Sequence, residues 1–143
     1  MEELQEQQEK SLLRETKKVE IAAEQTPFDS LDPEVQLAIR CAQDKKGIDI
    51  KGLDLREVAT FTEYFILVTG SNQRQVQAIA DDINEKLKHE RGVKPVRIEG
   101  YNAAEWVLLD YGDFIVHIFD KDARDFYDLE RLWLDAGRVE IPE

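Results

Sequence analysis

The apolar run YFILVTG, residues 64–70, constrains the fold of this chain more than any other segment. The run is short, contains aromatic and β-branched side chains, and is apolar at consecutive rather than alternate positions. Such a run predicts a β-strand that is buried on both faces of a sheet. A chain of 143 residues is long enough to build one domain with a real core around such a strand.

Helices are predicted on both sides of this strand in the sequence. Asp32 suits an N-cap and Pro33 the first helical position, and Gly47 can end this first helix. A second helix starts after Asn72, where Gln75 completes a capping-box pattern, and it ends near 91–92. The apolar residues at helical spacing are Leu31, Val35, Ala38 and Ala42 for the first helix and Val76, Ile79, Ala80, Ile83 and Leu87 for the second.

Further extended segments are predicted at 48–55 and around 96–98. The segments WVLLDY and FIVHIF flank Gly112-Asp113, a pattern typical of a two-residue hairpin turn. With the helices, this order predicts an α/β (α+β) domain, in which helices pack on a mixed sheet of about five strands. Residues 28–143 form this domain, and the Glu-, Gln- and Lys-rich residues 1–27 are expected to be an acidic and polar mobile tail.

A last helix is predicted from about Asp122 to Ala136, and Gly137 ends it. At 100° per residue, one broad arc of this helix is expected to face the core. The residues on that arc are Phe126, Leu129, Leu132, Trp133 and Ala136. Tyr127 and Leu134 fall together on a different side, beside acidic residues. A second apolar strip of this kind is either incidental or part of a contact surface.

The charge of the chain is strongly acidic and unevenly distributed. The formal net charge is −12, which disfavours a phosphate backbone as a direct partner. From Glu99 to Glu143 there are twelve acidic and four basic residues, a net charge of −8. These residues form either a solvated acidic face or a docking surface for a basic protein. In a docking surface, aromatic side chains would anchor the partner and carboxylates would steer it.

The location of the protein follows from what the sequence lacks. There is one cysteine, Cys41, in a setting that favours a buried helix position over a reactive one. No apolar run approaches the roughly 20 residues that span a bilayer, and the acidic start of the chain does not resemble a signal or transit peptide. We therefore expect a cytoplasmic protein with no membrane partner.

Two features of the sequence are candidates for a metal site or a catalytic site. His117, in the middle of FIVHIF, is interpreted first as a packed and hydrogen-bonded core residue, then as a partner contact, and last as a metal ligand. Gly70-Ser71 before a helix is similar to the phosphate-binding start of nucleotidyltransferase domains. The next acidic pair, Asp81-Asp82, lies within a helix, where neighbouring side chains point about 100° apart and cannot converge on one ion. We expect no enzyme activity, no metal site and no cofactor.

Several motifs in a fixed order resemble the ribosomal silencing factor family, also called the Iojap family. The resemblance runs from about Asp32 to Ala136. Its marks are EYFILVTG, Arg74-Gln75-Val76, Ala78-Ile79-Ala80-Asp81, Glu99-Gly100, WVLLDYGDFIVHIF, Arg124, Tyr127-Asp128-Leu129-Glu130 and Leu132-Trp133.

The resemblance implies a nucleotidyltransferase-like fold without enzyme activity. It implies binding to the large ribosomal subunit through its fourteenth ribosomal protein. The bound factor would sterically block joining with the small subunit and so repress translation when nutrients are scarce, and free copies would form homodimers. The residues expected as surface contacts are Glu99, Trp106, Asp110, Tyr111, Asp113, His117, Arg124, Tyr127 and Glu130. Leu129 and Trp133 are assigned to the core, and Phe119 to either environment.

Two alternatives stay open from the residues themselves. One is a residual enzyme of the nucleotidyltransferase fold, which the absence of a carboxylate pair in the following strand disfavours. The other is a homodimeric interaction module for a different basic protein, which the same acidic and aromatic last third would serve equally well.

Overall fold

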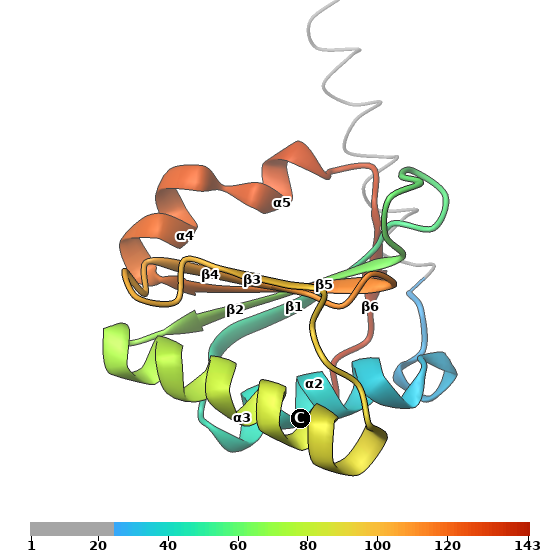
Figure 1. The fold of residues 1–143 in the computed structure, drawn as a ribbon. Helices are drawn as coiled ribbons and strands as arrows, with labels where there is room; N and C mark the ends of the chain where they lie inside the picture. Colours follow the sequence, from blue (N-terminus) through green and yellow to red (C-terminus); the bar gives the residue numbers. More distant parts are fainter. Residues whose placement is uncertain (1–24) are drawn as a thin grey trace, which may run out of the picture.

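The computed structural model describes residues 25–143 and shows a mixed sheet with helices on both faces (Figure 1). Its elements, in chain order, are η1 (Phe28–Ser30), α2 (Pro33–Asp44), β1 (Ile48–Asp54), β2 (Tyr64–Gly70), α3 (Gln73–Arg91), β3 (Arg97–Glu99), β4 (Trp106–Asp110), β5 (Phe114–Asp120), α4 (Lys121–Tyr127), α5 (Leu129–Leu132) and β6 (Gly137–Val139). The predicted fold class, helices packed on a mixed sheet, is confirmed.

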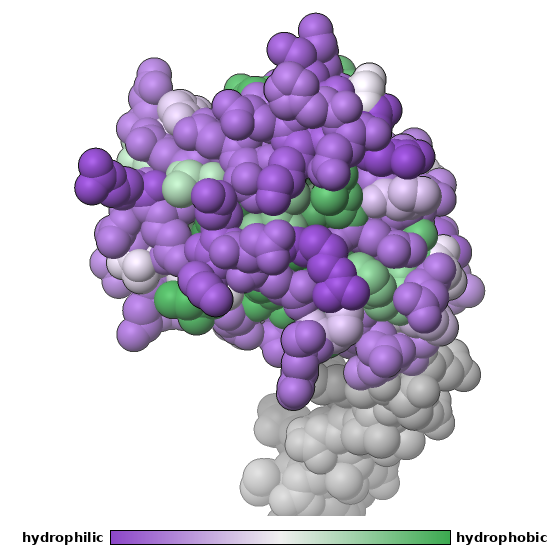
Figure 2. Space-filling model, turned by 90° about the horizontal axis from the view of Figure 1, so that it is seen from below, coloured by the Kyte–Doolittle hydropathy of each residue, from purple (hydrophilic) through white to green (hydrophobic). Residues whose placement is uncertain are grey.

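The sheet has the strand order β3-β4-β5-β2-β1-β6. Only β2 and β5 pair in parallel, while the other neighbouring strands are antiparallel. Helices α2 and α3 cover one face, and α4 and α5 lie on the other, above the sheet in Figure 1. Figure 2 shows the lower face, whose surface is largely hydrophilic with small separate apolar spots.

The prediction of a strand buried on both faces is confirmed for β2, in which every residue is buried. Its side chains alternate between the two faces of the sheet. Ile66 and Val68 belong to the core under α2 and α3, whereas Phe65 and Leu67 belong to the core under α4 and α5. The domain is therefore built in three layers, with one apolar core on each side of the sheet.

The first two predicted helices are confirmed, including their inward-facing stripes. Asn72 caps α3, because its Oδ1 accepts a hydrogen bond of 2.8 Å from the Gln75 N–H. The Gln75 side chain in turn accepts from the Ser71 N–H, one residue before the position that a standard capping box uses. Asp32 occupies the N-cap position of α2 but makes no side-chain capping bond.

The last predicted helix is wrong as a single element. Asp128 adopts a left-handed conformation with φ of 45°, which divides the segment into the seven-residue α4 and the four-residue α5. The angle of 100° per residue does not carry across this break, so the predicted core face fails at two positions. Phe126 is 81% exposed and Leu132 is 73% exposed, whereas Leu129 and Ala136 are buried and Trp133 is partly buried.

The residues after this segment form a strand that the sequence did not predict. Gly137–Val139 is β6, which pairs with Gly52–Asp54 of β1 and raises the strand number from about five to six. Thr26 makes an isolated parallel bridge to Val139, and its hydroxyl donates a 2.6 Å hydrogen bond to Asp54. The prediction of a mobile tail concerns mainly residues 1–24, which lie outside the described part of the chain.

Glycines lie on both sides of β4, at Gly100 before it and at the predicted hairpin turn, Gly112, after it. The hairpin is confirmed, since the Tyr111 N–H donates to the Phe114 carbonyl across Gly112-Asp113. Gly100, at the end of β3, has φ of 76°, and a Cβ there would lie 2.1 Å from the Trp106 carbonyl oxygen. Only glycine allows β3 to approach the start of β4 this closely. Gly100 thus fixes the backbone that carries Trp106.

Substituting Gly100→Ala should destabilise the domain more than Gly112→Ala. Both glycines have positive φ, but a Cβ at Gly112 would meet nothing within 4 Å. Gly112→Ala therefore costs only the backbone term, about 1–2 kcal/mol. Gly100→Ala adds the overlap with Trp106 and should cost about 3 kcal/mol or more. Urea unfolding of both variants measures this difference, and equal losses would contradict the close approach.

Candidate docking surface

The face of the sheet under α4 is incompletely covered at its β3–β4 end. Trp106 and Leu108 are two positions apart on β4, so both side chains point to the α4 side of the sheet. Glu99 of β3 lies opposite Leu108 and shares this face. Helix α4 packs over β5 and β2, so Trp106 and Leu108 stay only partly buried and Glu99 is exposed.

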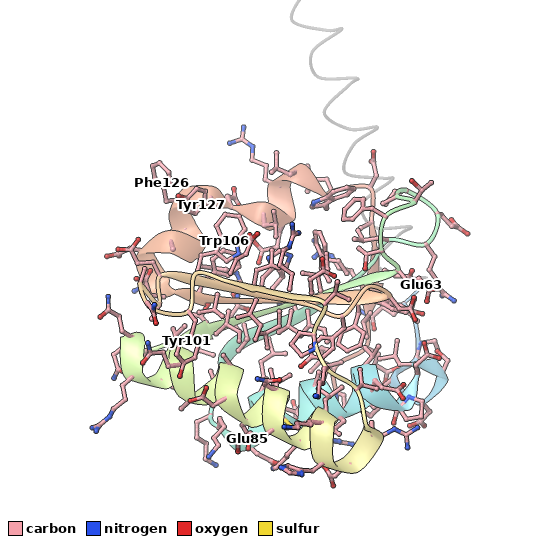
Figure 3. The ribbon with its side chains drawn as sticks, in the orientation of Figure 1. Glu63, Glu85, Tyr101, Trp106, Phe126 and Tyr127 are labelled. Carbon is pink, nitrogen blue, oxygen red and sulfur yellow. The ribbon has the colours of Figure 1, made fainter. Side chains whose placement is uncertain are left out.

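Aromatic side chains of α4 extend this open area. The Tyr127 ring lies 4.7 Å from the Trp106 ring, centroid to centroid, and Phe126 contacts Tyr127 edge-on at 5.1 Å. Figure 3 shows Trp106 rising from the sheet towards Tyr127, with Phe126 farther out. Tyr127 is 50% exposed and Phe126 is 81% exposed. We call the set Glu99, Trp106, Leu108, Phe126 and Tyr127 the Trp106 surface.

Acidic residues lie on the same elements as the aromatic members of the Trp106 surface, or next to them in the chain. Glu105 precedes Trp106, and the exposed residues Asp122 and Asp125 lie on α4 with Phe126 and Tyr127. Glu99 pairs with Arg97 at 3.4 Å, an exposed ion pair that water and salt screen strongly. The surface therefore combines an apolar aromatic centre with a negatively charged margin.

His117 lies beneath this surface and not in it. It is 4% exposed, and its Nδ1 accepts a 3.0 Å hydrogen bond from the Trp106 Nε1–H. Phe65 contacts the imidazole edge-on, with ring centroids 4.5 Å apart. Burial lowers the pKa of His117 to about 3. The expectation that His117 is a surface residue is wrong, and its first interpretation as a packed, hydrogen-bonded core residue is confirmed.

Arg124 is also buried, at 6% exposure, so its expected place on the surface is wrong. Its guanidinium donates to the Thr69 hydroxyl at 3.0 Å, to the Asp49 carbonyl at 3.0 Å and to Glu130 at 2.8 Å. These partners lie on β2, β1 and α5. Arg124 therefore connects α4 to the sheet and to the next helix. The Glu130 carboxylate is partly buried and forms an ion pair with Arg124.

Three predicted contact residues lie at the β4–β5 hairpin, away from Trp106 along β4. Tyr111 is buried and stacks on Phe114 at 4.8 Å, so its expected surface position is wrong. Asp110 accepts a 2.8 Å hydrogen bond from the Gly112 N–H and lies 3.5 Å from Arg97. Asp113 is exposed. Of the nine predicted residues, the structure brings Glu99, Trp106 and Tyr127 together.

Sequence reasoning missed two members of the Trp106 surface. Phe126 was assigned to the core because the last helix was treated as continuous, and Leu108 received no role. The alternation of WVLLD places Leu108 on the same face as Trp106 and would have identified it. Nothing before Asp128 in the sequence signals the left-handed residue that turns Phe126 outward.

The carboxylates in the middle of α3, Asp81 and Asp82, have other partners. Asp81 is exposed and accepts a hydrogen bond from the Tyr101 hydroxyl at 3.0 Å. Asp82 lies 3.5 Å from Lys86, one turn along the helix. Within residues 25–143, no group of three or more His, Cys, Asp or Glu side chains is placed to hold a metal ion.

Comparison with known proteins supplies the family. The family model described as "Ribosomal silencing factor during starvation" matches residues 28–143. The chain belongs to the ribosomal silencing factor family. The match extends beyond the motifs around Trp106 and includes the sixth strand.

Individual relatives agree with this family. The chain is 41% identical to "Ribosomal silencing factor RsfS" of Halalkalibacterium halodurans over 107 residues, which cover 75% of this chain and 91% of the relative. It is 40% identical to the protein of the same name from Bacillus subtilis, over 75% of this chain and 90% of the relative. A crystal structure of a Chromobacterium violaceum protein has a TM-score of 0.68 and 40% identity, covering 77% of this chain and 88% of that one.

In this member of the ribosomal silencing factor family, no helix within residues 25–143 has the length and apolar character that crossing a bilayer requires.

Cys41 is buried in α2, as its sequence setting predicts. Burial raises the pKa of its thiol to about 12, and the nearby Asp82 carboxylate adds to this shift. The thiol is therefore protonated at neutral pH and poorly nucleophilic.

Replacing His117 by Phe should make the fold less sensitive to acid. The pKa of His117 falls from 6.5 to about 3 in the folded chain. Between these values, the unfolded chain takes up a proton that the folded chain does not. Each pH unit of acidification below 6.5 therefore lowers the free energy of unfolding by about 1.4 kcal/mol through this residue. Above pH 6.5 the effect disappears.

Urea unfolding at pH 7.5 and pH 5.5 measures this effect. Any loss of packing in His117→Phe is present at both values and cancels in the difference. The drop in unfolding free energy on acidification should be smaller in His117→Phe than in the unsubstituted protein by about 1.4 kcal/mol. Equal drops would contradict a neutral, buried imidazole.

Proposed function

We propose that this protein binds the large ribosomal subunit through its fourteenth ribosomal protein and uses the Trp106 surface to do so. Once bound, it occupies space that the small subunit needs, and it thereby prevents subunit joining and represses translation under nutrient limitation. Family membership supports this reading, because the family model itself is described as a silencing factor during starvation. The observation that carries the site is the aromatic cluster that the partly buried Trp106 forms with the exposed rings of Tyr127 and Phe126.

The physical character of the Trp106 surface fits a basic protein partner. Tryptophan and tyrosine are the residues that most often anchor protein interfaces, because each buries a large area with few rotatable bonds. Here they stand together on the open end of the sheet, with Leu108 beside them. The exposed Glu99 lies opposite Leu108 on β3, and the exposed Asp122 and Asp125 lie on α4 with Phe126 and Tyr127. Ribosomal proteins are typically basic, so the charges are complementary.

The proposed mechanism is occlusion and requires no chemical step. The protein needs one face to hold the large subunit and enough bulk on the remaining faces to exclude the small subunit. The hydrophilic lower face formed by α2 and α3 (Figure 2) suits exposure to solvent while the upper face is bound. We also propose that the protein acts in the cytoplasm, that free copies form homodimers, and that it is not an enzyme.

Sedimentation with purified ribosomal particles tests the proposed function. The protein should co-sediment with large subunits and not with small subunits. When an excess is added before the subunits are mixed, the yield of joined ribosomes should fall. Binding to large subunits with undiminished joining would contradict occlusion. Binding to neither subunit would contradict the ribosomal partner and favour a module for another basic protein.

Substituting Tyr127→Ala should speed dissociation from the large subunit. A buried aromatic anchor is worth about 2 kcal/mol or more, which corresponds to a roughly thirty-fold loss of affinity. Leu132→Ala is the matched control, because Leu132 is an exposed apolar residue on α5 outside the Trp106 surface. Both variants should keep the thermal midpoint of the unsubstituted protein.

Association and dissociation rates at low and high salt complete this test. The effect of Tyr127→Ala should persist at high salt, because burial of an aromatic ring is not screened, unlike charge steering. Leu132→Ala should dissociate at the unsubstituted rate. A folded Tyr127→Ala protein that dissociates no faster than the Leu132→Ala control would remove Tyr127 from the interface.

A further inference from the structure

The hydrogen bond between Trp106 and His117 connects the docking surface to the buried sheet. The two residues lie on neighbouring strands, β4 and β5. The indole Nε1–H donates to Nδ1 of His117 over 3.0 Å. His117 is 4% exposed, while Trp106 is only partly buried. The bond therefore joins a side chain of the surface to a side chain that cannot itself touch a partner.

The direction of this bond fixes the state of the imidazole. An indole nitrogen only donates, so Nδ1 of His117 must be unprotonated and the proton must sit on Nε2. Because burial lowers the pKa of His117 to about 3, the ring keeps this neutral state at physiological pH. Protonation would place a second donor against the indole N–H and break the bond.

The other imidazole nitrogen shows that His117 is not placed for packing alone. Its Nε2 is buried and has no hydrogen-bond partner in the described part of the chain. A buried donor without an acceptor costs free energy, which an apolar side chain at this position would avoid. The surrounding rings, Phe65 and Phe119, would accommodate an apolar ring as well. The bond from Trp106 is the polar interaction that the imidazole supplies here.

We propose that His117 is a positioning residue, which holds the Trp106 indole in the orientation that the docking surface requires. This inference rests on the proposed function of the Trp106 surface. With its N–H directed to His117, the indole packs against Phe119 at 5.0 Å and against Tyr127 at 4.7 Å. Without the acceptor, the indole N–H is unpaired beneath the surface. Rotating the indole so that this N–H faces water then lowers the free energy. That rotation separates the Trp106 and Tyr127 rings.

A double-mutant cycle tests the inference through binding of the 143-residue protein to purified large subunits. His117→Phe keeps a flat ring and removes the acceptor, while Trp106→Phe keeps an aromatic ring and removes the donor. His117→Phe alone should weaken binding about three- to ten-fold, the range expected for one hydrogen bond. In the Trp106→Phe background, the same change should have little further effect, because the bond is already absent.

A merely structural role would not give this pattern. If His117→Phe weakens binding equally in both backgrounds, the histidine acts through general packing and the inference is overturned. Unchanged affinity of folded His117→Phe overturns it as well. His117→Asn retains an acceptor close to the position of Nδ1 and should bind more tightly than His117→Phe. If His117→Phe does not fold, a His117→Asn protein that folds but has lost the Trp106–Tyr127 contact overturns the inference.

Nuclear magnetic resonance of the free protein separates failure of this inference from failure of the proposed function. The indole N–H resonances of Trp106 and Trp133 are distinguished with Trp133→Phe. In the unsubstituted protein, Trp106 should show nuclear Overhauser contacts to Tyr127, and His117→Phe should shift the Trp106 resonance and weaken those contacts. Unchanged contacts overturn the positioning role. If the unsubstituted protein does not bind large subunits, the proposed function fails, and these spectra still decide the role of His117.

Discussion

The parallel pairing of β2 with β5 is the constraint on which the rest of the fold depends. Both strands are almost entirely buried, and seven residue pairs join them from Tyr64–Phe114 to Gly70–Asp120. Two adjacent strands of this kind place apolar side chains on both faces of the sheet, so both faces need a cover of helices. Parallel strands also need a long crossover, and here α3, β3 and β4 lie between them in the chain.

The two covers are unequal, and the docking surface results from this inequality. The lower face receives α2 with 12 residues and α3 with 19. The upper face receives α4 with 7 residues and α5 with 4. Helix α4 packs over the central strands β5 and β2, so Trp106 and Leu108 of β4 stay only partly buried and β3 is exposed. Arg124 holds α4 over the centre through Thr69 and Glu130, which keeps Tyr127 at the margin of the cover. Trp106 is thus left partly exposed by the architecture, not by a local irregularity.

The sequence predicted the elements whose signals are local and failed where a distant contact decides. The strand 64–70, the capped helix after Asn72 and the hairpin at Gly112 are each specified by their own residues. The break at Asp128 is different, because aspartate adopts the left-handed conformation only occasionally, so its identity alone does not signal the φ of 45° found here. The buried position of Arg124 likewise depends on Thr69, 55 residues earlier. The sequence limited the candidate contact residues to the acidic and aromatic last third of the chain. It could not distinguish residues on the surface from buried residues beneath it, such as His117 and Arg124.

On the proposed function, the charge around the Trp106 surface decides which part of a ribosomal particle the protein recognises. Aromatic rings alone would stack on exposed bases as well as on protein side chains. Carboxylates such as Glu99, Asp122 and Asp125 repel phosphates, whereas they attract lysine and arginine. On a particle covered largely by RNA, these carboxylates disfavour contacts with phosphates more than they favour the contact with a basic protein surface. The aromatic rings then supply the affinity for a basic protein surface, and the carboxylates restrict binding to such surfaces.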